Sequence, residues 1–489
     1  MNDLKKQINS LNRISGVLEP SAQQRNELLA QLQQYSNAFL DQLSTVPSYS
    51  AEKANQDIFQ VGKDKKELKE ILEIYSREVA AKGIKPASGG HMGYIPGGGI
   101  YSSALADYLA DITNEYAGIS FASPGAVAME QELLDWMKSL FGFPSSSVGN
   151  LTSGGSIANM MALTAARDRH KIKGADIEKS VVYLSSHLHH CNLKALRIIG
   201  LEDVVIRHLQ LDAGSKIIAS DLAEKIGEDK AAGLKPFLVI ASAGTTDTGA
   251  IDPLKEIGEI AEANDLWYHI DAAYGGFFIL TESGRDKLQG IETADSLAVD
   301  PHKGLFLPFG LGAVLVKDKQ AVFHSHHHSA TYMQDALENF GSIDPADVSP
   351  ELTKHFRALR LWLPFQLHGI EAFAACLEEK LLLTRYFRQR LQEIGFKVGP
   401  EPDLSVSYYW WPLEQGDENN FNKRLMKEVH KDGSVFLSST IIKAKFVIRM
   451  AILSFRTKID TVDRAVEMLD RARKKVSREF NFKEEKDRI

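Results

Sequence analysis

Residues 266–276 read LWYHIDAAYGG, a short and largely apolar run that leads directly into an aspartate and then a pair of glycines. An apolar run of this length that ends in turn residues is typical of a buried β-strand. Similar runs occur at residues 181–184, 237–240 and 313–316, and helical patterns lie between them, as at residues 254–264. Short buried strands that alternate with helices are typical of an α/β domain with a mostly parallel central sheet. The sequence therefore predicts this fold class for the middle of the chain.

Two regions of different character flank the α/β part. Residues 1–90 are polar and helix-like, and an amphipathic helix is expected to run from Ser21 to Leu43. Its apolar face can pack either on its own domain or on a second subunit. We therefore expect an N-terminal helical segment that embraces a second subunit (1–90), a large ligand-binding domain (91–370) and a small α+β C-terminal domain (371–489). In the last of these, strands are expected near residues 405–410 and 446–450, and helices near residues 370–391 and 461–474.

The composition is that of a globular protein. The 489 residues are 44% hydrophobic and 25% charged, with a net charge of −7, which leaves no basic surface for nucleic acid. Cys191 and Cys376 are the only cysteines, so no disulfide framework is expected. A reducing, cytoplasmic location is expected instead. The N-terminus lacks the apolar segment of a signal peptide, and no apolar run approaches the ~20 residues of a membrane span. The expected partners are a small-molecule substrate and a second subunit, with no nucleic acid and no membrane.

Residues that can carry chemistry follow several of the predicted strands. Ligands of a parallel sheet lie at the carboxyl ends of its strands, so these residues are expected to meet at one edge. A Gly-Gly-Ser turn that opens a helix presents free N–H groups to a phosphate, and a carboxylate at the end of a buried strand requires a cation. The features in question are the turn Gly154-Gly155-Ser156, the histidine-rich run 187–190, the hydroxyl-bearing turn 244–246, Asp271, and Lys303 after the strand expected at 296–299.

Together these residues supply the groups that pyridoxal 5'-phosphate (PLP) requires. PLP needs an amine for its aldehyde, a carboxylate that keeps its ring nitrogen protonated, a phosphate cradle and a flat group on the ring face. Lys303 and Asp271 match the first two needs, and the 154–156 turn and His190 match the last two. Each feature alone has an ordinary explanation, because most such turns only cap helices and a histidine run is often a surface loop. A metal would be a second use for the histidines, but no carboxylate or cysteine pattern supports it, and no metal site is predicted.

Several longer motifs carry a resemblance to a known family. They are Ser123-Pro124 with Glu130 and Trp136, the turn and helix at 152–166, Asp271-Ala272-Ala273-Tyr274, Pro301-His302-Lys303, FRALRLW at 356–362, and the segment 446–457 with Arg449. In this order and at these separations, the chain resembles the group II PLP-dependent amino-acid decarboxylases, which include aromatic-L-amino-acid, glutamate and sulfinoalanine decarboxylases. The resemblance covers residues 91–457.

The resemblance implies a fold, a reaction and a set of site residues. The fold is PLP-dependent transferase fold type I, that of aspartate aminotransferase, in a homodimer whose active sites lie between the subunits. The reaction is decarboxylation of an L-amino acid to the amine and CO2, with PLP held on Lys303 as a Schiff base. The resemblance assigns ring stacking to His190 and cofactor contacts to Ala273 and His302. Thr246, in the hydroxyl-bearing turn after a strand, is a further expected cofactor contact. The family returns a proton to the substrate Cα from a tyrosine on a mobile loop, which makes Tyr332 the candidate within residues 324–335.

Three departures from the family concern the cofactor edge and the substrate pocket. Asp300 stands where several members have an asparagine that contacts the phosphate, and a carboxylate beside a phosphate is unfavourable. Gly304 replaces a bulky aromatic residue, and the loop 91–99 is unusually rich in glycine. The residues expected to line the substrate pocket are Tyr94, Ile95 and Gly97.

The substrate and the exact reaction stay open at this point. No arginine cluster marks the 94–97 wall, which favours an aromatic or other apolar amino acid. An acidic amino acid (glutamate, aspartate or cysteine sulfinate) is the alternative, since a partner subunit can supply a cation. Other PLP reactions, namely aldehyde synthesis, carbon–carbon lysis and transamination, are further alternatives, and a phosphate-ligand or metal-binding protein is the non-enzymatic one. The histidines at 324–328 fit a solvated loop, a pH-sensitive lid or an adventitious metal site.

Overall fold

A seven-stranded sheet forms the centre of the computed structural model, which describes residues 2–327 and 343–486. The strand order is β3-β9-β8-β7-β6-β4-β5; the strands from β8 to β5 run parallel, and β9 is antiparallel to both of its neighbours. This mostly parallel sheet confirms the predicted fold class. The strands are β3 (Val148–Thr152), β4 (Ser180–Ser185), β5 (Val205–Leu209), β6 (Lys235–Ser242), β7 (Trp267–Asp271), β8 (Ser296–Val299) and β9 (Gly312–Val316).

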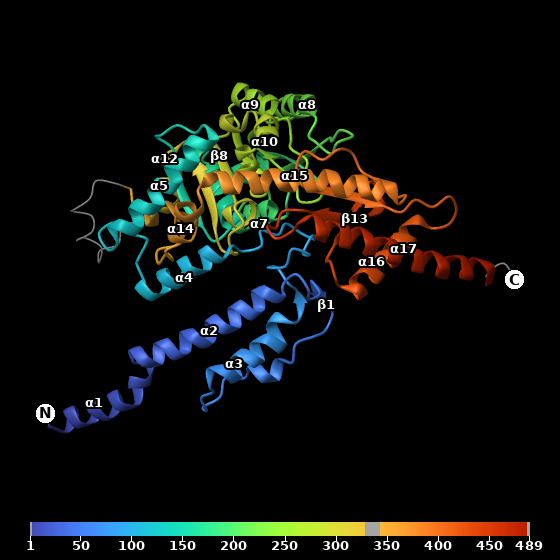
Figure 1. Ribbon diagram of the computed structural model, residues 1–489. Coiled ribbons are helices and arrows are strands. Elements are labelled where there is room, and N and C mark those ends of the chain that lie inside the picture. Colours follow the sequence, from blue (N-terminus) through green and yellow to red (C-terminus); the bar gives the residue numbers. More distant parts are fainter. Residues whose placement is uncertain (1, 328–342, 487–489) are drawn as a thin grey trace.

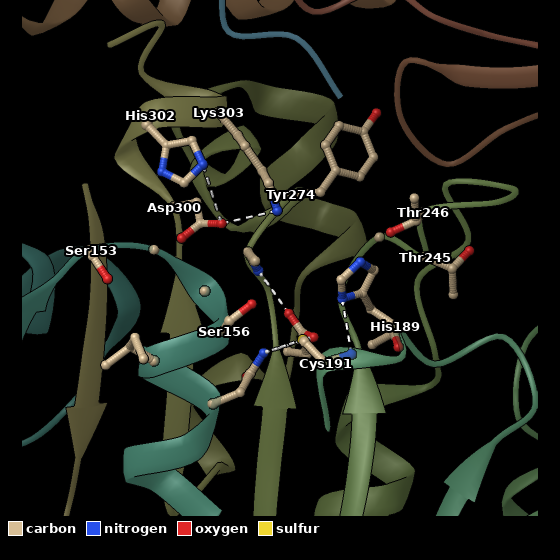
Figure 2. Close-up of a pocket in the computed structure, with 18 residues that line it drawn as sticks. Ser153, Ser156, His189, Cys191, Thr245, Thr246, Tyr274, Asp300, His302 and Lys303 are labelled. Atoms are coloured by element: carbon tan, nitrogen blue, oxygen red, sulfur yellow. Dashed lines mark hydrogen bonds and ion pairs between the residues drawn. The ribbon is translucent and has the colours of Figure 1, made fainter. Parts of the chain in front are cut away.

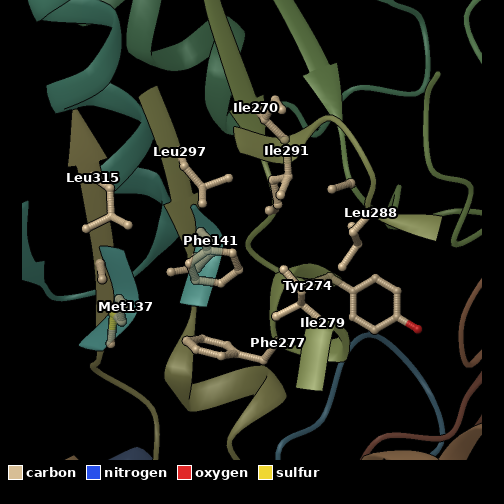
Figure 3. Close-up of a cluster of buried hydrophobic side chains, with 14 of the residues drawn as sticks. Met137, Phe141, Ile270, Tyr274, Phe277, Ile279, Leu288, Ile291, Leu297 and Leu315 are labelled. Carbon is tan, nitrogen blue, oxygen red and sulfur yellow. The ribbon is translucent and has the colours of Figure 1, made fainter. Parts of the chain in front are cut away.

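Helices cover both faces of this sheet (Figure 1). Successive side chains of a strand point to opposite faces, so strands buried on both sides are apolar throughout. One face carries Ile270 and Leu297, which pack with Phe141 of α5 (Figure 3). The other face carries Leu184 and Ala298 against α6 and α7. The covering helices are α5 (Pro124–Phe141), α8 (Ala219–Ala231) and α9 (Leu254–Ala263) on the first face, and α6 (Gly155–Arg169) and α7 (Cys191–Ile198) on the second.

The C-terminal part forms a second, smaller layer. Its antiparallel sheet has the order β10-β11-β13-β12, and α15, α16 and α17 pack on it and on one another. The predicted strands and helices are all present, but the last helix begins earlier and ends later than the sequence pattern indicates. The elements are α15 (Ile370–Glu393), β10 (Lys397–Val398), β11 (Val406–Trp410), α16 (Glu418–Asp432), β12 (Ser438–Ile442), β13 (Lys445–Ala451) and α17 (Ile459–Lys486).

The N-terminal helices extend away from this body (Figure 1). They are α1 (Asn2–Ser15), α2 (Ala22–Gln42) and α3 (Leu68–Tyr75), and none of the three contains a buried residue. Helix α2 starts where the sequence predicts, and a capping box begins it: the Ser21 hydroxyl accepts from the Gln24 N–H, and the Gln24 side chain accepts from the Ser21 N–H. The end of α2 packs on α3 through Tyr35 and Tyr75, but Leu28, Leu29 and Leu32 of its apolar face stay 40%, 45% and 42% exposed. Within the described ranges, no helix is both long and apolar enough to cross a membrane.

Candidate active site

A cavity of about 280 Å³ lies at the carboxyl ends of β4, β6, β7 and β8, beside the start of α6 (Figure 2). This is the edge of the sheet at which the sequence predicts a site. All of the predicted cofactor-binding residues except His190 line it, namely Gly154, Gly155, Ser156, Thr246, Asp271, Ala273, His302 and Lys303.

Lys303 enters the cavity from a short helix, α11 (Pro301–Gly304), that follows β8 directly. Its Nζ lies 2.9 Å from Oδ2 of Asp300, which is itself almost fully buried (Figure 2). Burial by itself lowers the pKa of Lys303, but the neighbouring groups, Asp300 first and then Asp271 and Cys191, together raise it by more, so the pKa lies above its usual value. At position 300, where several family members have asparagine, the carboxylate of Asp300 therefore forms an ion pair with Lys303.

Asp271 is a buried carboxylate held by three neutral donors. Its Oδ2 accepts from Nδ2 of Asn192 at 2.8 Å and from Nδ2 of Asn159 at 3.1 Å, and its Oδ1 accepts from the Ala273 N–H at 3.2 Å. In the part of the chain that the structure describes, no side-chain cation pairs with it. A buried anion is costly without a cation, so this position fits a cationic group of a ligand, such as a protonated ring nitrogen.

The turn between β3 and α6 forms a narrow cradle. A Cβ on Gly155 would lie 2.9 Å from an oxygen of Asp300 and 3.1 Å from Cβ of Ala273, so only glycine fits there. The first N–H groups of a helix have no partner within the helix and favour an anion. The hydroxyl residues Ser153 and Ser156 line the same end of the cavity. The cradle therefore fits a phosphate group.

Comparison with known proteins agrees with this geometry. The family model described as "Pyridoxal-dependent decarboxylase conserved domain" matches residues 47–405. The chain is 36% identical to the aromatic-L-amino-acid decarboxylase of Bacillus atrophaeus over 395 residues, which cover 80% of this chain and 82% of that protein. It is 30% identical to the bovine acidic amino acid decarboxylase GADL1 over 65% of this chain and 64% of that protein.

The chain belongs to the pyridoxal-dependent decarboxylase family. It is thus a PLP-dependent carboxy-lyase that converts an L-amino acid to the amine and CO2. The fold agrees: the crystal structure of Oryza sativa TDC with PLP and tryptamine superposes with a TM-score of 0.89 at 22% identity, over 94% of this chain and 99% of that one. The buried carboxylate, the glycine cradle and the cavity lysine all fit PLP.

The decarboxylase places His189, rather than His190, in the cavity wall. The two rings are neighbours, with centroids 4.3 Å apart, but His190 is exposed. Burial lowers the pKa of His189, which favours its neutral form. The predicted ring-stacking position is therefore corrected by one residue, because the turn after β4 directs the first histidine of the pair inward.

The loop expected to line the substrate pocket lies beside the cavity rather than in its wall. Tyr94 is 57% exposed, whereas Ile95 is buried. Gly97 packs on the lysine turn so closely that a Cβ there would lie 2.2 Å from the carbonyl oxygen of His302. The Tyr94 carbonyl accepts a hydrogen bond from Nη2 of Arg449 at 3.0 Å. None of these three loop residues lines the cavity of the single chain, and their contact with substrate stays a prediction.

Several residues in or directly behind the cavity were missed in the sequence. Asn159 and Asn192 reach Asp271 from helices α6 and α7, and both are fully buried. A polar residue on the otherwise apolar face of α6 is a signal that could have identified Asn159. Cys191, Ser242 and Thr245 also line the cavity, and burial raises the pKa of the Cys191 thiol to about 12, which keeps it protonated.

The histidine cluster is only partly described. His324 bonds to the Gln320 carbonyl, and His327 pairs with Asp347 at 3.0 Å and stacks on Phe323. Residues 328–342, and with them His328 and Tyr332, lie outside the described residues. Among the residues that are described, no group of three potential metal ligands occurs.

Asp300→Asn is expected to speed the capture of PLP by the apoprotein at neutral pH. Only the neutral amine of Lys303 attacks an aldehyde, and Asp300 raises the pKa of that amine. Without the carboxylate the pKa falls, and the neutral fraction near pH 7 grows about tenfold for each unit of the fall. The test is to mix apoprotein with PLP over a pH series and follow the visible absorbance. The half-maximal rate should move to lower pH, and an unmoved profile would show that Asp300 does not control the lysine.

Proposed function

We propose that this decarboxylase acts on aromatic L-amino acids. The observation that carries the proposal is the charge of the cavity wall. No arginine lines the cavity within the described residues, and its one lysine, Lys303, is engaged with Asp300. A substrate side chain that carried its own carboxylate would be buried there without a cation, at a large cost. The relative of higher identity, from Bacillus atrophaeus, is named for aromatic substrates, which supports the same choice.

We infer the role of each cavity residue from its position in the cavity. Lys303 holds the cofactor through its amine, Asp271 keeps the ring nitrogen protonated, and the 154–156 cradle holds the phosphate. His189, which lines the cavity, would cover one face of the cofactor ring and exclude water from it. When bound, PLP supplies an electron sink for the pair left by departing CO2. We assign return of the proton to Cα to Tyr332 on the sequence pattern alone, since that residue lies outside the described part of the chain.

A substrate panel tests the choice of aromatic amino acids. Tryptophan, tyrosine and phenylalanine should give amine with kcat/KM values at least about 100-fold above those for glutamate, aspartate and cysteine sulfinate, because a buried, unpaired carboxylate costs several kcal/mol. Amine and aldehyde should be measured together under air, so that aldehyde synthesis is detected in the same assay. Equal or better turnover of an acidic substrate would overturn the proposal.

We further propose that the enzyme is a homodimer in which the N-terminal helices cover the second subunit. The residues of α1 at helical spacing, Leu4, Ile8 and Leu11, are 61%, 47% and 65% exposed. Helix α4 (Tyr101–Thr113) also exposes large apolar side chains, among them Leu105 and Leu109. Apolar faces of this extent are typical of a surface that another chain covers.

The double variant Ile8→Glu/Leu11→Glu should weaken dimerisation by at least about tenfold, because it buries two charges in the proposed contact. Sedimentation velocity over a concentration series measures the effect. Asn2→Glu/Asn9→Glu is the matched control, since it adds the same charge to the opposite side of the helix. A parent protein that is monomeric and fully active at assay concentration would contradict the dimer.

A further inference from the structure

A line of buried side chains leads from Asp271 away from the cavity. The Asn159 amide that donates to Asp271 presents its Oδ1 to Nε2 of His269 at 2.8 Å. Nδ1 of His269 lies 2.8 Å from Oγ of Ser296, and that oxygen accepts from Nε1 of Trp267, also at 2.8 Å. Asn159, His269 and Ser296 are fully buried and Trp267 is 3% exposed. Four polar groups are therefore joined end to end behind the cavity, in a place that water does not reach.

The strands determine why these residues meet. Trp267, His269 and Asp271 alternate along β7, so their side chains share one face of the sheet, the face that α6 covers. Ser296 stands opposite His269 on the neighbouring strand β8. Asn159 comes from α6. The line is therefore fixed by the register of two strands and one helix, and it runs from the far end of β7 to the cavity.

Both ends of this line set the direction of its hydrogen bonds. The Asp271 carboxylate only accepts, so the Asn159 amide nitrogen must face it; this nitrogen donates to Asp271 and to the Cys191 sulfur, and the amide oxygen faces His269. The His269 Nε2 must then carry the proton, and its Nδ1 must accept from the Ser296 hydroxyl. The Trp267 indole only donates, which leaves the Ser296 oxygen as its acceptor. Every donor in the line thus meets an acceptor in one arrangement.

This arrangement requires a neutral His269. Burial lowers the pKa of His269 to about 4, so the ring is uncharged near neutral pH. In a charged ring both nitrogens would donate. The Ser296 oxygen would then accept from both His269 and Trp267, and the Ser296 hydroxyl proton would have no acceptor among these residues. The groups facing the ring are Asn159, Ser296 and, further along the strand, Asp271.

We propose that His269, Ser296 and Trp267 are positioning residues that orient the Asn159 amide and thereby set the hold of Asp271 on the cofactor ring nitrogen. The proposal rests on the proposed role of Asp271. If His269 no longer donates to the Asn159 oxygen, the Asn159 amide can rotate by 180° and point this oxygen at the Asp271 carboxylate. Asp271 would then lose one donor and face a lone pair, which weakens its ionised form and loosens its grip on a cation.

The test measures the affinity of the apoprotein for PLP without substrate. His269→Leu removes both ring nitrogens and should weaken PLP binding about 10- to 100-fold, as expected for loss of hydrogen bonding around a buried charge. His269→Gln can place an amide N–H near Asn159 and should restore most of the affinity. Ser296→Ala removes the next link and should weaken binding in the same direction, by up to about tenfold.

Tyr268→Phe is the matched control. Tyr268 is the neighbouring residue of β7, is buried on the opposite face and donates its hydroxyl proton to the Leu254 carbonyl at 3.0 Å. The variant loses one buried hydrogen bond from the same strand but leaves the line intact, so its PLP affinity should equal that of the parent. Asn159→Ala combined with His269→Leu should be no weaker than Asn159→Ala alone, because both act through the same amide.

The possible failures can be told apart. A folded His269→Leu protein that binds PLP as tightly as the parent overturns the proposed line, provided that Asp271→Asn does weaken binding. If Asp271→Asn also leaves the affinity unchanged, the proposed role of Asp271 itself is wrong. Should His269→Leu not fold, Ser296→Ala and Trp267→Phe decide the question, and parent-like affinity in both overturns the proposal.

Discussion

Replacing Lys303 by alanine is expected to lower turnover at least about 10⁴-fold, the scale seen when a residue that bonds covalently to the reacting system is removed. The visible absorbance that borohydride abolishes should disappear with it. Lys303 is the lysine that lines the cavity in the described chain, at the carboxyl end of β8 and facing the carboxylate of Asp300. The measurement is amine release together with an absorbance scan before and after borohydride.

Lys303→Arg is the matched variant for this prediction. It keeps a cation beside Asp300, so the fold of the turn is preserved, but a guanidinium does not bond to an aldehyde at neutral pH. Both variants should therefore lose turnover and absorbance equally. If the Lys303→Ala variant keeps its turnover and its borohydride-sensitive absorbance, Lys303 is not the residue that holds the cofactor.

Asp271→Asn is expected to fold and to lose activity by roughly 10²- to 10³-fold, the range observed when one preorganised electrostatic partner is removed. The new amide is nearly the same shape, and its oxygen can still accept from Asn159 and Asn192. It no longer carries the negative charge that keeps a ring nitrogen protonated. Steady-state kinetics and the PLP content of the same preparation should be measured together, so that lost chemistry is separated from lost cofactor.

Asp221→Asn is a suitable control for this loss. Asp221 is 5% exposed and accepts from the Gln210 N–H and from Lys225, and none of these three residues lines the cavity. Its replacement removes a buried carboxylate of the same type without touching the site, so activity should be close to that of the parent. Full activity in Asp271→Asn with PLP bound would show that this carboxylate is structural.

Much of the fold could be predicted because its strands are short, apolar and separated by helices. The runs at 181–184, 237–240 and 313–316 lie in strands of the central sheet, and the run at 266–270 lies in β7 except for its first residue. The direction of the last of these could not be predicted, since β9 turns back antiparallel to β8 and apolar composition carries no direction. The N-terminal helix α2 was predicted from its amphipathic pattern, but a local pattern does not show which surface covers an apolar face.

The site was predictable where chemistry and position coincide. Lys303, Asp271 and the 154–156 turn each follow a strand and each carry a distinct group, so the edge of the sheet brings them together. The sequence could not show whether His189 or His190 faces the cavity. In a helix or strand the side-chain direction repeats regularly along the sequence, but in a short turn it does not. The line behind Asp271 also needed the structure, since it depends on the register of β7 with β8 and on the rotation of α6.

Peptide mapping of the borohydride-reduced enzyme by mass spectrometry tests the central claim most directly. The claim is that the cavity at the carboxyl ends of β7 and β8 holds PLP through one lysine. Lys354 and Lys380 are the natural comparisons, because both are fully buried in the fold but neither lines the cavity. The predicted result is a reduced pyridoxyl group on the peptide that contains Lys303 and on no other. A pyridoxyl group on a different lysine would contradict the account, and so would an active enzyme that carries no pyridoxyl group after reduction.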